Sequence, residues 1–160
     1  MWRPEGKAIA LLQAGKVNEA VGLLEEVIAT GGLRNSQRRN LLGICYARDG
    51  KLAEAQRLYE GSLEEKPGDP AVLTDLGNVA LLRGDPDRAR ELYLLALQSN
   101  VFLLEPRHNL VLAYQDTGHF EKCLRAYRDY RAIASLRKWV RLLAILSVGL
   151  LLTYALAGGI

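Results

Sequence analysis

The sequence predicts an all-α protein: a solenoid of about four helical hairpins, followed by one C-terminal transmembrane helix. Three observations lead to this prediction. Glycines recur at intervals of 35, 34 and 34 residues, at Gly15, Gly50, Gly84 and Gly118. The apolar residues between them follow helical spacing. The last 19 residues, 142–160, carry no charge, whereas every Lys, Arg, Asp and Glu lies at or before Arg141.

Length and composition limit the function classes. With 160 residues the chain can form one compact unit or a short repeat array. Hydrophobic residues make up 49% and charged residues 24%, with a net charge of +3, which excludes disorder and a strongly basic nucleic-acid binder. The polar start, MWRPEGK, does not resemble a secretory signal, so we expect the N-terminal part to remain in the cytosol.

Each 34-residue unit reads as two helices joined at a glycine. Five positions after each glycine stands a small residue, and four positions later a large one: Ala20 and Leu24, Ala55 and Tyr59, Ala89 and Tyr93, Cys123 and Tyr127. The glycine supplies the positive φ that ends the first helix. Asp69 before Pro70 and Asp85 before Pro86 place an N-cap acceptor ahead of a proline at the first helical position.

This pattern resembles the tetratricopeptide repeat, most clearly in LLGICYARDGKLAEAQRLYEGSLEEKPGDP. The resemblance implies units at about 1–35, 36–69, 70–103 and 104–137, within an array spanning 1–135. Gly43 and Gly77 would let the two helices of a hairpin approach closely, with Tyr59 and Tyr93 filling the space beside them.

The resemblance also implies that the first helices of the hairpins line a peptide-binding groove. The matching positions are Ile9, Asn40, Ile44, Arg48, Thr74, Asn78, Leu81, His108 and Leu112. Amides could bind a peptide main chain while aliphatic side chains hold an apolar residue. The alternative is that these are ordinary exposed helix residues. Family members that clamp a terminal carboxylate use Lys, Asn and Arg, but the corresponding places hold Glu5, Ile9, Leu41, Ala71 and Asp75.

The sequence offers no arrangement for catalysis, metal binding or a cofactor. His108 and His119 are 11 positions apart, and neither has a partner at ligand or triad spacing. Cys45 and Cys123 are predicted to be two free thiols in different hairpins. We therefore expect no enzyme activity and no small-molecule substrate.

Nucleic acid is not an expected partner either. Residues 125–160 contain six Lys and Arg against one Asp, a balance of +5. Because the whole chain carries +3, residues 1–124 carry −2. A slightly acidic array does not attract a phosphate backbone.

The uncharged segment 142–160 is the predicted transmembrane helix. As a helix, 19 residues span ~28 Å, close to the ~30 Å hydrocarbon thickness. The basic juxtamembrane segment 136–141, with Arg137, Lys138 and Arg141, would then lie at the headgroups and keep the repeats on the cytoplasmic side. The alternative is a buried capping helix, although such a helix needs a polar outer face.

Two further features concern this C-terminal helix. No glycine or proline occurs between His119 and Val148, so the last helix of the array could run into the span without a break; the alternative is a break near Ser135. Small residues recur every four positions, at Gly149, Thr153 and Ala157, as in membrane helices that pack closely.

The sequence therefore predicts a single-pass, tail-anchored interaction module: an adaptor, scaffold or assembly factor that binds proteins and is held by membrane lipid. The alternative is a structural or accessory subunit of an integral membrane complex, in which the transmembrane helix is a packing surface.

Overall fold

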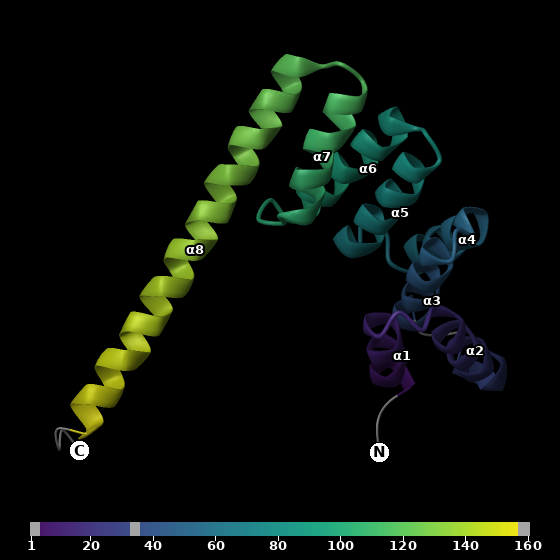
Figure 1. Cartoon of the computed structure of the whole chain (residues 1–160), viewed down its shortest axis with the longest axis horizontal. Coiled ribbons are helices and arrows are strands. Elements are labelled where there is room, and N and C mark those ends of the chain that lie inside the picture. Colours follow the sequence, from purple (N-terminus) through teal and green to yellow (C-terminus); the bar gives the residue numbers. More distant parts are fainter. Residues whose placement is uncertain (1–3, 33–35, 157–160) are drawn as a thin grey trace.

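The computed structural model describes residues 4–32 and 36–156, and all the regular secondary structure in these ranges is helical. The helices form four consecutive hairpins that stack into a curved array (Figure 1), which confirms the predicted all-α solenoid. The elements are α1 (Pro4–Gln13), α2 (Val17–Val27), the π-helical turn η1 (Ile28–Gly32), α3 (Ser36–Arg48), α4 (Leu52–Glu65), α5 (Pro70–Leu82), α6 (Pro86–Ser99), α7 (Glu105–Asp116) and α8 (Phe120–Leu156).

The periodic glycines end the first helix of each hairpin, as predicted. Gly50 has a φ of +78° and Gly84 a φ of +79°, in the left-handed region that favours glycine. After α3, the N–H of Lys51 donates to the carbonyl of Tyr46 at 2.9 Å, and the N–H of Gly50 donates to that of Ala47 at 3.2 Å. This pair of bonds is a Schellman motif, which satisfies the last carbonyls of α3.

The predicted aspartate caps are also present. The carboxylate of Asp69 accepts the backbone N–H of Ala71 at 3.0 Å, and that of Asp85 accepts the N–H of Arg88 at 3.0 Å. Pro70 and Pro86 follow directly, where the missing N–H of proline costs no hydrogen bond. The starts of α5 and α6 are therefore fixed by local sequence.

The core repeats along the array because each hairpin uses the same packing. Gly43 lies against the ring of Tyr59, and Gly77 against the ring of Tyr93, while both rings are almost fully buried. Cys45 is buried in the first two hairpins and Cys123 is partly buried in the fourth, and both are free thiols, as predicted. Burial raises the pKa of the Cys45 thiol to about 11.

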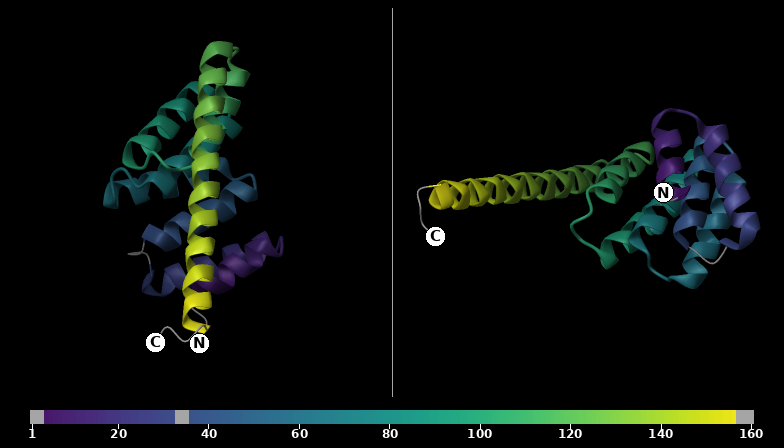
Figure 2. Two further views of the ribbon diagram at one scale, coloured as in Figure 1. Left: turned by 90° about the vertical axis from the view of Figure 1, so that its left-hand side faces the viewer. Right: turned by 90° about the horizontal axis from the view of Figure 1, so that it is seen from below.

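Helix α8 is continuous over 37 residues, with no break near Ser135. Its first part packs on α7: Ala126 contacts the cluster that contains Leu110 and Ala113, and the Cys123 thiol donates to the carbonyl of Val111 at 3.6 Å. The rest of α8 extends away from the array (Figure 2), and residues from Leu136 onward include a long series of exposed apolar side chains.

The prediction of a transmembrane helix over 142–160 is not supported. Among residues 4–32 and 36–156, no helix combines the length and the apolar character needed to cross a membrane.

Of the predicted small-residue stripe, Gly149 has no packing partner within the described part of the chain. No atom lies within 4 Å of the place that a Cβ on Gly149 would take. The hydroxyl of Thr153 donates to the carbonyl of Leu150, on its own helix, at 2.8 Å. Ala157, the third member of the stripe, lies outside the described residues.

Candidate functional site: a groove between α3, α5 and α7

Three successive first helices enclose a groove of about 370 Å³. Side chains three or four positions apart on α3 and on α5 point into it, because that spacing places them on one helix face. We call it the α3/α5/α7 groove. Its lining consists of Ile44, Ala47 and Arg48 on α3, Tyr59 on α4, Asp75, Asn78, Val79 and Leu82 on α5, and Glu105 on α7.

Asn78 is held in the groove by two neighbouring helices. Its Oδ1 accepts the hydroxyl of Tyr93, on α6, at 2.8 Å and the amide of Asn109, on α7, at 2.7 Å. Its own amide N–H group points to Oε1 of Glu105, 3.5 Å away. Asn78 is therefore both a groove residue and a link between the third and fourth hairpins.

Asp75 and Glu105 give the groove an acidic character. Burial raises the pKa of the Asp75 carboxyl to about 7, and the negative charge of Glu105 acts in the same direction. A hydrogen bond from the Asn40 side chain opposes this rise. Among the described residues, the ion pairs include neither Asp75 nor Glu105. The groove thus holds two acidic groups that form no ion pair among the described residues, with the cationic side chain of Arg48 in the same lining.

Three of the predicted groove residues, Ile44, Arg48 and Asn78, line this groove, and Asn40 borders it through its bond to Asp75. Arg48 also donates from Nη1 to the carbonyl of Leu12 at 3.1 Å, which ties α3 to α1. The Oδ1 atom of Asn40 is buried and accepts no hydrogen bond from any described residue.

The structure places the other predicted groove residues elsewhere. Thr74 is 3% exposed, and its hydroxyl donates to the carbonyl of Pro70 at 2.6 Å. Leu81 packs between the third and fourth hairpins. Ile9 on α1 and Leu112 on α7 are exposed, but neither lines the groove. The ring of His108 lies 5.5 Å from that of Tyr130 on α8, also away from the groove lining.

Sequence reasoning missed Glu105 and interpreted Asp75 only as a departure from a carboxylate clamp. Asp75 stands three residues before Asn78 on α5, so helical spacing alone could have placed the two on one face. No comparable signal exists for Glu105, which begins the next hairpin and reaches the groove only through the stacking of α7 on α5.

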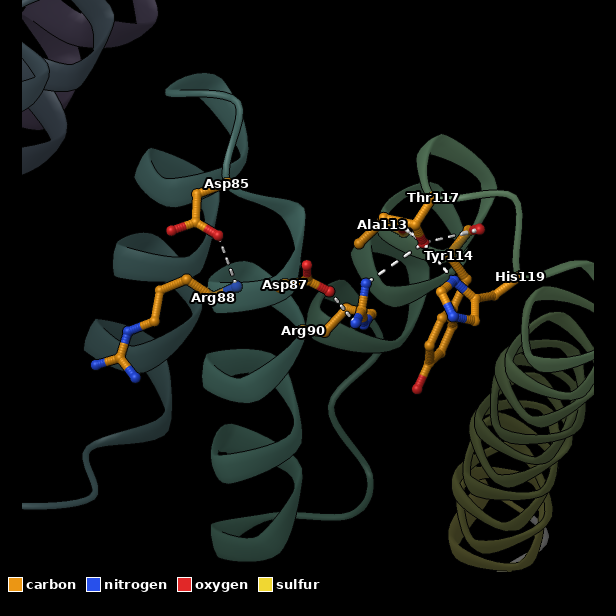
Figure 3. Close-up of polar contacts among 8 residues, drawn as sticks. All are labelled: Asp85, Asp87, Arg88, Arg90, Ala113, Tyr114, Thr117 and His119. Atoms are coloured by element: carbon orange, nitrogen blue, oxygen red, sulfur yellow. Dashed lines mark hydrogen bonds and ion pairs between the residues drawn. The ribbon is translucent and has the colours of Figure 1, made fainter.

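A second polar cluster joins the third and fourth hairpins at their turns (Figure 3). Arg90 on α6 pairs with Asp87, lies 5.5 Å from the centre of the Tyr114 ring, and donates to the hydroxyl of Thr117 at 3.3 Å. Nδ1 of His119 lies 2.9 Å from that hydroxyl. Each group is engaged by a neighbour in the fold, so the cluster is a structural link.

The two histidines take part in separate contacts, one with Tyr130 and one with Thr117. Within the described ranges, His, Cys, Asp and Glu side chains form no group of three that could hold a metal ion.

Comparison with known proteins agrees with the repeat architecture. Two family profiles described as tetratricopeptide repeat match residues 6–70 and 46–101. A comparison with curated protein sequences finds no match.

Among solved structures, the array is similar to several of MamA. A crystal structure of MamA superposes with a TM-score of 0.74 at 14% identity, covering 82% of this chain and 76% of that one. A structure of MamA MSR-1 gives a TM-score of 0.67 at 25% identity, covering 81% and 74%. Another MamA crystal structure gives 0.71 at 15% identity, covering 80% and 69%. At such identities the likeness shows a shared fold.

Proposed function

This chain belongs, through residues 6–101, to the tetratricopeptide repeat family, whose members are protein-interaction scaffolds and not enzymes, and we propose that it binds a partner protein's segment in the α3/α5/α7 groove. The bound segment offers a basic side chain to Asp75 and Glu105.

The observation that carries this proposal is the pairing of apolar walls with acidic groups in one groove. Ile44 and Leu82 provide aliphatic surface, and Leu82 is 67% exposed. Asp75 and Glu105 repel each other, and a Lys or Arg side chain would relieve this repulsion. A segment with a basic residue between apolar residues therefore complements the groove in shape and in charge.

Two matched peptides test the proposal by fluorescence polarisation. They differ at one central position, Lys or Glu, within an otherwise identical segment of Leu and Val. We expect the Lys peptide to bind about tenfold more tightly, the effect of ~1.4 kcal/mol. The double variant Asp75→Asn with Glu105→Gln should lose this preference.

The control is Glu64→Gln, which removes one negative charge from an exposed position on α4, outside the groove. This variant should retain the preference for Lys. Equal affinity for both peptides in the unmodified protein, or a preference that survives in the double groove variant, would show that the groove is not the binding site.

A further inference from the structure

The C-terminal part of α8 carries a long series of exposed large apolar side chains. Eleven large apolar side chains between 136 and 152 are each at least 42% exposed. They are Leu136, Trp139, Val140, Leu142, Leu143, Ile145, Leu146, Val148, Leu150, Leu151 and Leu152. A contiguous apolar surface of this extent indicates a contact with an apolar partner or medium.

The distribution of these side chains around the helix indicates which kind of contact. Leu150, Leu151 and Leu152 are 75%, 67% and 59% exposed, and consecutive helical residues point about 100° apart. The three therefore point to three different sides of α8. A single packed helix covers one stripe and would leave the other sides in water, whereas lipid chains surround a helix completely.

A cluster of cations lies where the apolar part of α8 begins. Arg137, Lys138 and Arg141 belong to none of the ion pairs among the described residues. Trp139, in the same turn, is 65% exposed. Cations of this kind attract anionic headgroups, and Trp favours the interface between headgroups and hydrocarbon.

The loop between α6 and α7 adds a second apolar element at this level. Phe102 is 56% exposed and lines a shallow pocket together with Leu136, Val140 and Arg141 of α8. Aromatic and cationic groups from two elements therefore meet on one side of the molecule, at the start of the exposed apolar part of α8.

We propose that α8, from Leu136 onward, inserts into an anionic lipid bilayer, with Arg137, Lys138, Arg141 and Phe102 at the headgroups. This contact does not depend on the groove, and it would present the groove at a lipid surface. Insertion requires the apolar side chains of α8 to enter the hydrocarbon, and does not require the helix to cross the bilayer.

Vesicle flotation tests the insertion. The full chain is synthesised in a cell-free system with vesicles of phosphatidylcholine, either alone or mixed with phosphatidylserine. We expect it to float with both and more completely with the anionic vesicles. In the double variant Leu146→Asp with Leu150→Asp, the vesicle-bound fraction should fall at least about tenfold, because two carboxylates would have to enter the hydrocarbon.

The cation cluster is tested with Arg137→Gln, Lys138→Gln and Arg141→Gln combined. Partitioning into anionic vesicles should fall roughly fivefold for each charge removed, while partitioning into phosphatidylcholine alone should change little. The matched control removes three exposed cations from the array: Lys16→Gln, Lys66→Gln and Arg88→Gln. It should float like the unmodified protein.

Trp139 reports the position of α8 directly. In a Trp2→Phe background, its fluorescence should shift to shorter wavelength when anionic vesicles are added, as the indole leaves water. The proposal is overturned if the aspartate variant floats normally, or if the chain stays away from vesicles and sedimentation shows a stable dimer. Peptide binding in the groove should be unchanged in the α8 variants, so the two proposals fail separately.

Discussion

A Cβ atom placed on Gly77 of α5 would lie 2.5 Å from Cε1 of Tyr93 on α6, closer than Cβ atoms pack in proteins. One repeat earlier, a Cβ on Gly43 would lie 2.6 Å from Cε1 of Tyr59. The two tyrosine rings are almost fully buried and cannot move aside without displacing their neighbours. Glycine at these positions is therefore a requirement of the hairpin packing.

Replacing Gly77 with alanine should destabilise the array by about 1–3 kcal/mol, the usual cost of overpacking a core. The matched control is Gly22→Ala on α2, where no atom lies within 4 Å of the added Cβ. That change should instead stabilise the protein by about 0.8–1 kcal/mol, because alanine favours the helix more than glycine does. Urea unfolding of both variants measures the difference, and equal stabilities would contradict the packing argument.

Asn78→Ala should cost about 1–3 kcal/mol of stability, because it leaves the buried Tyr93 hydroxyl and the Asn109 amide without their acceptor. Asn78 lines the groove, so its replacement by alanine should weaken peptide binding. The structure predicts that Asn78→Ala also weakens the fold. Tyr93→Phe, which removes only one of the two donors, should cost less in the same unfolding assay.

The free energy of unfolding should depend on pH because Asp75 titrates at a different pH in the folded and unfolded states. Its pKa is about 7 in the folded protein and about 3.8 in the unfolded chain. Between these values the folded state holds a proton that the unfolded state has lost, so stability falls as the pH rises from about 4 to about 7. Asp75→Asn removes this fall and should raise stability above pH 7 by at most about 4 kcal/mol. The gain should vanish near pH 4; a gain that does not depend on pH would contradict the assignment.

Binding of the Lys peptide should strengthen as the pH rises through about 7, because Asp75 becomes negatively charged over that range. The charged and titratable groups that share the groove with Asp75 are Glu105 on α7, Arg48 on α3 and Tyr59 on α4, and the charge of Asp69 also raises its pKa. Glu105→Gln should lower the midpoint, since it removes a charge that raises the Asp75 pKa. Fluorescence polarisation across this pH range measures both effects, and a flat profile for the unmodified protein would exclude Asp75 from the contact.

The two thiols should differ in reactivity. Cys45 is fully buried, and burial raises its pKa to about 11, so little reactive thiolate forms at neutral pH. Cys123 is only partly buried. In the native protein, a thiol reagent should modify Cys123 well before Cys45, and mass mapping of partially labelled protein identifies the site. Faster modification of Cys45 would contradict the packing of the first two hairpins.

The sequence alone determined the features that depend on neighbours along the chain. The glycine period set the hairpin turns, and the aspartate and proline pairs set the starts of α5 and α6. The resemblance to the tetratricopeptide repeat implied that Gly77 lies beside Tyr93. These features are local, since each is fixed by residues within about half a repeat. A run of uncharged residues is local too, but composition alone predicted a transmembrane helix that the described part of α8 does not support.

Only the tertiary structure decided which residues meet in the groove. The hydrogen bond between Asn78 and Asn109 joins residues 31 positions apart. The rotation of α5 about its own axis decides which of its residues face the groove. Thr74 and Leu81 are packed in the array, whereas Asp75 lines the groove. Residues one position apart on a helix differ by about 100° in direction, so a small rotation exchanges core and groove positions. That rotation is set by how the hairpins pack on one another, which the repeat pattern of a single chain does not specify.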